Sequence, residues 1–228
     1  IKAVADAHDA MFVAIGAQEG KKLRLDGIDA KGVDSAVAML DEIGNGNIPD
    51  YTGKNVVIIG GGNVAMDAAR SAVRCGAAQV SCVYRRRIDD MTALDSEIEA
   101  AIAEGVEMIT LQAPVSIEVN EAGECTGLVI QTQMASTYDA AGRPKPVSVN
   151  TPTEVVPCDV ILNAVGQGIV SAPFEEFGMP ANRTIFQANL DTSVEGMPGV
   201  FVGGDCQTGP STAIRAVAAG KVAAYAID

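Results

Sequence analysis

The amino-acid sequence predicts an α/β protein built around a parallel β-sheet. Short apolar runs alternate with segments of helical periodicity along the chain, and strands separated by helices pair in parallel through right-handed crossovers. The composition agrees, since 48% of the 228 residues are hydrophobic, only 4% are aromatic and 24 are glycine. A chain of this length can bury one large core or two smaller ones.

The strands are predicted where a short apolar run ends at a glycine, a charged residue or a turn. These runs are residues 11–15, 55–59, 79–84, 106–111, 159–164 and the apolar part of 199–205. Residues 114–135 alternate less regularly and predict a hairpin or meander, with a turn around Asn120–Gly123. The polar segment 139–146 predicts a surface turn.

The helices are predicted from apolar residues at helical spacing and from start and stop signals. They cover Val33–Leu40, about 63–75, a segment opened by Thr92 and about 211–227, and a loop is expected at 44–53. Thr92 is the predicted N-cap of a capping-box variant, TALD, and Gly105 ends that helix. The apolar faces that we expect to be buried are Leu94, Ile98, Ala101 and Ile102 in one helix, and Ile214, Val217 and Ala218 in another.

Charge and cysteine content argue against several classes of function. A net charge of −13 disfavours nucleic acid or an anionic membrane as a partner, and no apolar run approaches the ~18–20 residues of a membrane span. The five cysteines form no Cys-x-x-Cys pair, which excludes a redox dithiol motif and a zinc knuckle within the chain. Isolated thiols predict a reduced, cytoplasmic protein with structural cysteines. We predict no metal site and give the single histidine, His8, no catalytic role.

The segment VVIIGGGNVAMDAAR (56–70) places three glycines between a predicted strand and a predicted helix. Gly60, Gly62 and Ala65 fit the pattern G-x-G-x-x-A, in which the glycines allow a tight turn and a close approach to a diphosphate. Asn63 is a suitable N-cap. An ordinary strand-to-helix turn is the simpler alternative. The residues predicted to bind the diphosphate through the helix start are Gly60, Gly61, Gly62, Asn63, Val64 and Ala65.

The end of the next strand predicts which dinucleotide is bound. A site selective for NAD has an acidic residue there, whereas this strand ends in Tyr84 and three arginines, Arg85–Arg87. Guanidinium groups can hold a 2′-phosphate that a carboxylate would repel. We therefore predict NADP(H) as the cofactor, with Arg85 and Arg86 as the phosphate contacts. A solvated turn is the alternative interpretation.

Two distant segments share one pattern. MFVAIGAQ (11–18) and VILNAVGQ (160–167) both consist of an apolar run, an alanine, a β-branched residue, a glycine and a small or polar end. Chance similarity between two buried strands that end in glycine turns is the alternative explanation.

With GGGNVAMDAAR, YRRR and VFVGGD…STAIRAVAAGKVAA in this order, the chain resembles the small subunit of NADPH-dependent glutamate synthase. It is also similar to the flavin domains of dihydropyrimidine dehydrogenase and of NADPH–ferredoxin transhydrogenases. The resemblance implies a Rossmann-like three-layer nucleotide-binding domain with a β-meander, inserted in a partial second FAD-type α/β domain. The implied boundaries are 1–30 for the end of the first FAD segment, 31–168 for the NADP(H) domain and 169–228 for the C-terminal FAD segment.

The resemblance also implies roles for residues outside the glycine motif. Ala164, Val165 and Gly166 would line the NADP(H) site. The FAD site would receive Gly204, Asp205, Thr212, Ala213 and Ile214. Hydride would pass from nicotinamide C4 to flavin N5, which needs positioning but no catalytic acid, base or nucleophile. Asp67, one turn into the helix, is therefore expected to stabilise the helix start or to pack at the domain junction.

The chain departs from the family pattern in three places. The second G-x-G-x-x-G, which holds the ADP half of FAD, is absent, and so is the cysteine-rich iron–sulfur domain. We expect both upstream of Ile1, or the clusters in a partner, so that the chain binds NADP(H) but holds FAD weakly or not at all. Asn163 stands where an apolar or small residue is usual.

The final electron acceptor stays open at the level of sequence. The glutamate synthase large subunit is the expected partner, and ferredoxin, a pyrimidine or a sulfur compound are alternative acceptors. A non-catalytic dinucleotide sensor is a hypothesis of another class, which would not need the segment GGD…STAI.

Overall fold

The computed structural model of the chain describes residues 1–140 and 142–228. It divides into two compact units: the central unit, residues 20–166, and the terminal unit, residues 1–19 together with 167–228. The chain crosses between them at β2 (Glu19–Gly20) and β12 (Gln167–Gly168). The division after residue 19 lies earlier than the boundary predicted after residue 30, because Asp26 already bonds to Ile117 within the central unit. One residue of the predicted turn at 139–146 lies outside the described residues.

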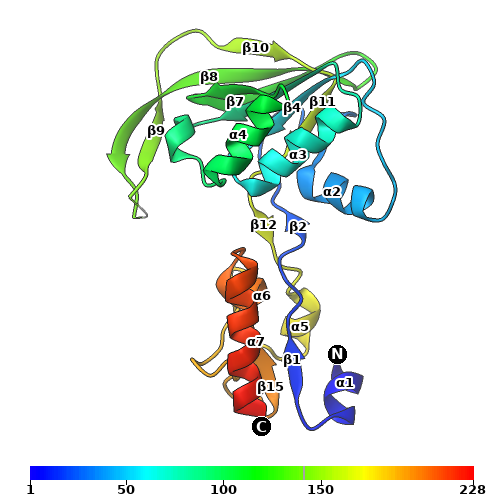
Figure 1. The fold of residues 1–228 in the computed structure, drawn as a ribbon, viewed down its shortest axis with the longest axis vertical. Coiled ribbons are helices and arrows are strands. Elements are labelled where there is room, and N and C mark those ends of the chain that lie inside the picture. Colours follow the sequence, from blue (N-terminus) through cyan, green and yellow to red (C-terminus); the bar gives the residue numbers. More distant parts are fainter. Residues whose placement is uncertain (141) are drawn as a thin grey trace. The chain divides into compact units, whose positions relative to one another are not determined.

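A five-stranded parallel sheet forms the middle of the central unit (Figure 1). Its strand order is β3 (Val33–Ser35), β11 (Val160–Asn163), β4 (Asn55–Ile59), β5 (Gln79–Tyr84) and β6 (Glu107–Thr110). β4 and β5 have the predicted bounds. Residues 33–35 were expected to begin a helix and instead form an edge strand paired with β11. Three residues at the edge of a sheet carry too little periodicity to be told apart from a helix start.

Three helices cover one face of this sheet: α2 (Ala36–Gly44), α3 (Asn63–Arg74) and α4 (Asp95–Ala103), with a 3₁₀ turn at Ile88–Asp90. α3 packs closely because the side chains that it turns to the sheet are small. The residues of this core include Val56, Ile58, Val80, Cys82 and Leu162 from the sheet and Ala65, Ala68, Ala69 and Ala72 from α3.

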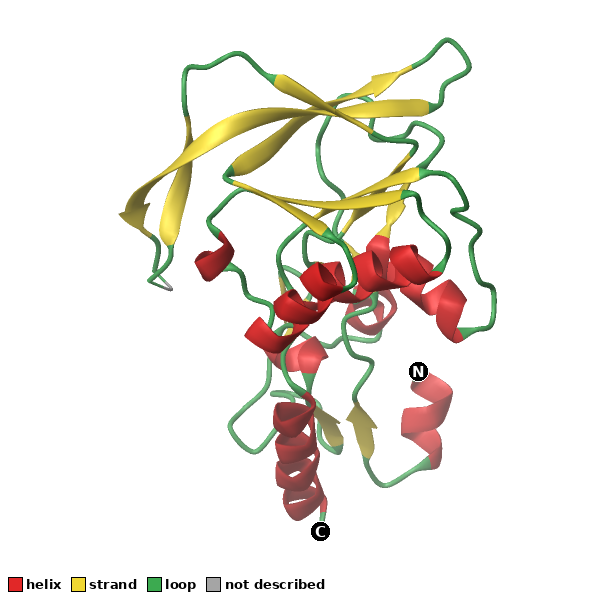
Figure 2. Ribbon diagram, turned by 45° about the horizontal axis from the view of Figure 1, so that its top comes forward, coloured by secondary structure: helices red, strands yellow, loops and turns green. Residues whose placement is uncertain are grey.

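An antiparallel meander covers the other face, as Figure 2 shows. It consists of β7 (Gln112–Val119), β8 (Cys125–Tyr138), β9 (Pro144–Ser148) and β10 (Glu154–Pro157). The meander packs Ile117, Leu128 and Ile130 against Val57 and Ile161 of the sheet. The predicted turn before β8 is confirmed, because the Asn120 side chain accepts the amides of residues 122 and 124. The three-layer α/β arrangement of the central unit follows the prediction.

The capping box predicted at Thr92 is wrong. α4 begins at Asp95 after Leu94, and no side chain caps it. Instead, the Thr92 amide donates a hydrogen bond to the Gly61 carbonyl oxygen, with an N···O distance of 2.9 Å. Residues 92–94 are held outside the helix by this contact with a distant turn, so the local capping signal does not decide where the helix starts.

The terminal unit contains the parallel pair β1 (Met11–Val13) and β15 (Val200–Val202), the hairpin of β13 (Ala181–Asn182) and β14 (Ile185–Phe186), and four helices. The helices are α1 (Lys2–Ala7), α5 (Ala172–Glu176), α6 (Asp205–Thr208) and α7 (Ala213–Ile227). Val13, Phe186, Val202 and Cys206 are among the residues of its core. No helix among the described residues is long and apolar enough to cross a bilayer.

The face of α7 made of Ile214, Val217 and Ala218 is exposed, which corrects the predicted burial of these side chains. The helix turns its small residues inward instead. Ala223 is 1% exposed, and a Cβ on Gly203 would come within 3.1 Å of the Ala219 Cβ. The face predicted at α4 is half correct: Ile98 and Ala101 are buried, whereas Ile102 and Leu94, which precedes the helix, are exposed.

Candidate functional site

The turn between β4 and α3 lies at the carboxyl edge of the sheet, and Gly60 makes it possible. Gly60 has φ +153°, and a Cβ there would stand 2.8 Å from the Ala164 carbonyl oxygen at the end of β11. Its amide donates to the Val83 carbonyl and its carbonyl accepts the buried Cys82 thiol. Burial raises the pKa of Cys82 to about 12, so the thiol stays a neutral donor. Only glycine fits this position.

Gly61 is enclosed by Tyr84 and by the segment 92–93, contacts that the sequence did not reveal. A Cβ on Gly61 would come within 2.6 Å of the Tyr84 ring, whose hydroxyl donates to the Asp90 carbonyl at 2.9 Å. The Gly61 carbonyl accepts the amides of Thr92 and Ala93. Tyr84 could have been suspected from its place at the end of β5, but nothing local predicts the contact with Thr92.

Asn63 was predicted as the N-cap of α3, and this prediction is wrong. Gly62 occupies the cap position, and the Asn63 Oδ1 accepts the Leu94 amide at 2.9 Å. The reason is again tertiary, because the segment before α4 supplies the donor that the Asn63 side chain accepts. Asn63 therefore ties the glycine turn to residues 92–94.

The start of α3 offers free donors and open space. Ala65 and Met66 donate to the Gly62 carbonyl, whereas the amides of Gly61, Gly62, Asn63 and Val64 have no hydrogen-bond partner in the part of the chain that the structure describes. A Cβ on Gly62 would meet only Thr92 Oγ1, at 3.3 Å. Bare amides at the positive end of a helix dipole bind anions, and the missing Cβ lets a diphosphate approach. The residues present thus fit a dinucleotide diphosphate.

The three arginines after β5 have three different environments. Arg85 is exposed, and no ion pair is found for it among the described residues. Arg86 is 8% exposed, and its Nε and Nη2 donate to the Pro144 carbonyl and to Asp139. Arg87 makes two bonds to Asp90, at 2.8 and 3.0 Å. Arg85 is therefore free to contact a ligand. Arg86 already bonds to the β8–β9 arm, which consists of the paired strands β8 and β9 and the turn between them.

The end of β11 brings Ala164, Val165 and Gly166 to the same edge as the glycine turn. The Ala164 amide donates to the Ile59 carbonyl, so the two strand ends lie side by side. Asn163 is buried and satisfied: its Nδ2 donates to the Lys21 carbonyl at 2.6 Å and its Oδ1 accepts the Val165 amide. This explains the departure at Asn163, because the amide group joins the returning strand to the entering segment.

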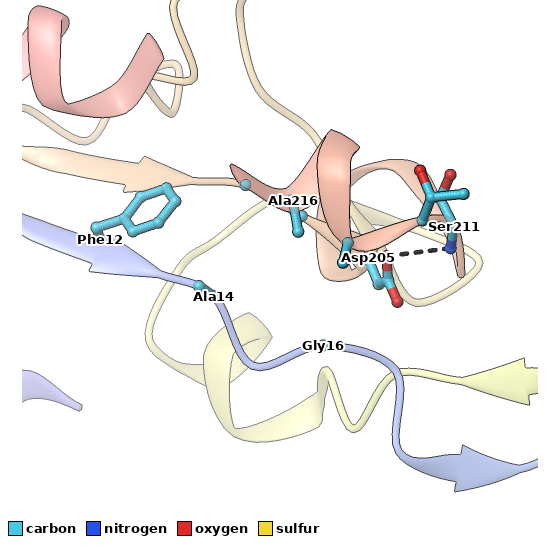
Figure 3. A pocket seen from close by; sticks show the side chains of 10 residues that line it. Phe12, Ala14, Gly16, Asp205, Ser211 and Ala216 are labelled. Atoms are coloured by element: carbon cyan, nitrogen blue, oxygen red, sulfur yellow. Dashed lines mark hydrogen bonds between the residues drawn. The ribbon is translucent and has the colours of Figure 1, made fainter. Parts of the chain in front are cut away.

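A cavity of about 190 Å³ lies within the terminal unit (Figure 3). It brings together Gly204, Asp205, Thr212 and Ala213 of the predicted FAD site, and Asp205 accepts the Ser211 amide at 3.1 Å. Ile214 does not line the cavity and its side chain is 81% exposed. The amides of residues 212–214 have no hydrogen-bond partner among the described residues. The sequence did not single out Phe12, Ala14 and Gly16, which also line the cavity, although their alternate spacing along an extended segment indicates one face.

No group of three or more His, Cys, Asp or Glu side chains suited to a metal ion occurs within residues 1–140 and 142–228.

The pyridine nucleotide-disulphide oxidoreductase family matches residues 2–220. This chain belongs to that family. It is 36% identical to the NADP(+)-dependent formate dehydrogenase subunit beta of Moorella thermoacetica, over 97% of this chain and 31% of that protein. It is 33% identical to a putative glutamate synthase [NADPH] small chain of Cereibacter sphaeroides, over 99% of this chain and 57% of that protein. The Escherichia coli glutamate synthase [NADPH] small chain is 31% identical, with 96% and 50% covered.

Solved structures share the fold. Mycobacterium tuberculosis FprA, determined in complex with NADPH, superposes with a TM-score of 0.79 at 20% identity, over 99% of this chain and 64% of that one. Thioredoxin reductase of T. acidophilum gives a TM-score of 0.71 at 19% identity, over 96% and 64%. The chain thus spans only part of its relatives, 31% of one and 57% of another. The predicted α/β fold and the resemblance to glutamate synthase small subunits are confirmed.

Proposed function

We propose that this chain is the NADPH-binding part of an FAD-dependent oxidoreductase that passes hydride from NADPH to FAD. The observation that carries the proposal is the start of α3, where four consecutive amides have no partner in the described chain and the space at Gly62 is open. The proposal is supported by relatives whose names include NADPH or NADP(+).

Each group of residues has one task in this proposal. The α3 amides and the helix dipole hold the diphosphate, with Gly60 and Gly62 allowing its approach. Arg85 binds the 2′-phosphate, and Arg86, engaged with Asp139, sets the position of the β8–β9 arm beside it.

The remaining predicted contacts form two groups, one for the nicotinamide that gives the hydride and one for the FAD that accepts it. Ala164, Val165 and Gly166 line the nicotinamide half of the site. In the terminal unit Gly204, Asp205 and the amides of residues 212–214 hold FAD. When bound, NADPH supplies the hydride and FAD accepts it, so the chain contributes binding and orientation rather than an acid or base.

We further propose that the electrons continue to glutamate synthesis through the glutamate synthase large subunit, by way of iron–sulfur clusters in another part of the protein or in a partner. The likeness to a formate dehydrogenase subunit favours a second candidate, in which another redox subunit is the acceptor. To distinguish the two acceptors, the complete protein with FAD is mixed first with NADPH and then with each acceptor, while the flavin absorbance is followed. A non-catalytic sensor would leave the flavin absorbance unchanged.

Substitution of Arg85 tests the cofactor assignment. We expect the unmutated chain to bind NADPH at least ~10-fold more tightly than NADH, and Arg85→Ala to remove most of that preference, because a charge-assisted phosphate contact contributes roughly 1.5–3 kcal/mol. The binding of NADH should not change. Lys54→Ala is the control, since Lys54 is exposed and precedes β4 at the opposite edge of the sheet. Equal affinity of the unmutated chain for both nucleotides contradicts the proposal.

A further inference from the structure

The sheet topology indicates where each half of a bound dinucleotide would lie. After β4 the chain continues through α3 to β5 on one side, while β11 flanks β4 on the other. Ligands of open α/β sheets bind at such a switch point, at the carboxyl ends of the strands. With the diphosphate at α3 and the 2′-phosphate at Arg85 after β5, the nicotinamide half must extend over the end of β11.

One cation, Lys21, is held at this end of β11. The Lys21 amide donates to the Gly166 carbonyl at 3.2 Å, and its carbonyl accepts Asn163 Nδ2 at 2.6 Å. A Cβ on Gly166 would lie 3.4 Å from Lys21 Cδ and 4.0 Å from its Nζ. The side chain therefore runs past Gly166, within the central unit.

The ammonium group of Lys21 has no ion-pair partner in the part of the chain that the structure describes, although the net charge of the protein is −13. Lys21 is exposed, so its charge is available to a ligand. A backbone fixed at both its donor and its acceptor keeps the base of this side chain at the edge of the sheet, so a ligand there has to order only the side chain itself.

We propose that Lys21 binds oxygen atoms of the nicotinamide mononucleotide half, its phosphate and ribose. This inference rests on the proposed function. Lys21 and Arg85 then hold the two halves of one dinucleotide from opposite sides of the glycine turn. Lys21 contacts the half that carries the hydride and Arg85 the half that carries the 2′-phosphate.

The test compares two ligands and two neighbouring lysines. NADPH contains both halves, whereas 2′,5′-ADP lacks the nicotinamide mononucleotide half. We expect Lys21→Met to weaken NADPH binding about 10-fold and to leave 2′,5′-ADP binding unchanged, as measured by calorimetric titration of the 228-residue chain. Lys22→Met removes the same charge from an exposed neighbour and should change neither affinity. Thermal unfolding of each variant checks that the fold is kept.

Two results overturn the inference alone. Lys21→Met could bind NADPH as the unmutated chain does, or both lysine variants could weaken both ligands equally, which would indicate a general charge effect. Failure of the unmutated chain to bind either ligand would instead contradict the proposed function itself.

Discussion

The three consecutive glycines of the β4–α3 turn are required for different reasons. At Gly60 the backbone has φ +153° and the Ala164 carbonyl leaves no room for a Cβ. At Gly62 the backbone is extended, with φ −106°, which any residue can adopt, and the space is open. Gly60 thus serves the fold, whereas Gly62 leaves the open space that the proposed diphosphate needs.

Alanine substitutions separate these two roles. Gly60→Ala should lower the free energy of unfolding by roughly 1–3 kcal/mol, because it strains the backbone and meets a carbonyl. Gly62→Ala should change the stability by less than about 1 kcal/mol but weaken NADPH binding more than ~10-fold, because its Cβ faces the diphosphate. Denaturant unfolding and NADPH titration of both variants measure these effects. Equal nucleotide affinity of Gly62→Ala and the unmutated chain would show that the diphosphate does not approach this residue.

At the scale of elements, an ion-pair network joins α3 to α4. Arg70 bonds to Glu97 and Glu104, at 2.7 and 2.9 Å, and Arg74 also bonds to Glu104. The hydrogen bonds from Arg74 and Arg70 hold the pKa of Glu104 below its ordinary value. The ionised form of Glu104 is therefore more stable in the folded state than in the unfolded state.

This network predicts a pH dependence of stability. Because the folded-state pKa of Glu104 is depressed, its contribution is present above the ordinary value of 4.5 and is lost as the pH falls through the folded-state pKa. Glu104→Gln should reduce stability at neutral pH and flatten the decline below pH 4.5, as followed by denaturant unfolding at a series of pH values. Glu99→Gln, on the exposed side of the same helix, is the control. Parallel pH profiles for Glu104→Gln and the unmutated chain would contradict this.

For the whole molecule, the division into two units has an energetic basis. The central unit has a core on each face of its sheet, and the terminal unit has a separate core around Phe186 and Val202. A contiguous segment with its own core can fold independently.

We therefore expect residues 20–166, expressed alone, to unfold in one cooperative transition and to bind NADPH as tightly as the full chain does. NADPH should raise the unfolding temperature of this segment, because a ligand that binds only the folded state stabilises it. Calorimetry with and without NADPH measures both properties. A segment that folds but has lost NADPH affinity would mean that the terminal unit supplies part of the nucleotide site.

The sequence by itself determined the α/β fold, the bounds of β4 and β5, the glycine turn and the family, because short apolar runs, glycine spacing and motif order are local properties. Only the tertiary structure decided which side chains are free at the site. Asn63 and Thr92 were expected to cap helices and instead join two distant segments. Arg86 looked equivalent to Arg85 until the β8–β9 arm supplied its partners. Hydrogen-bond partners far apart in sequence meet only when the chain folds, so no local pattern can assign them.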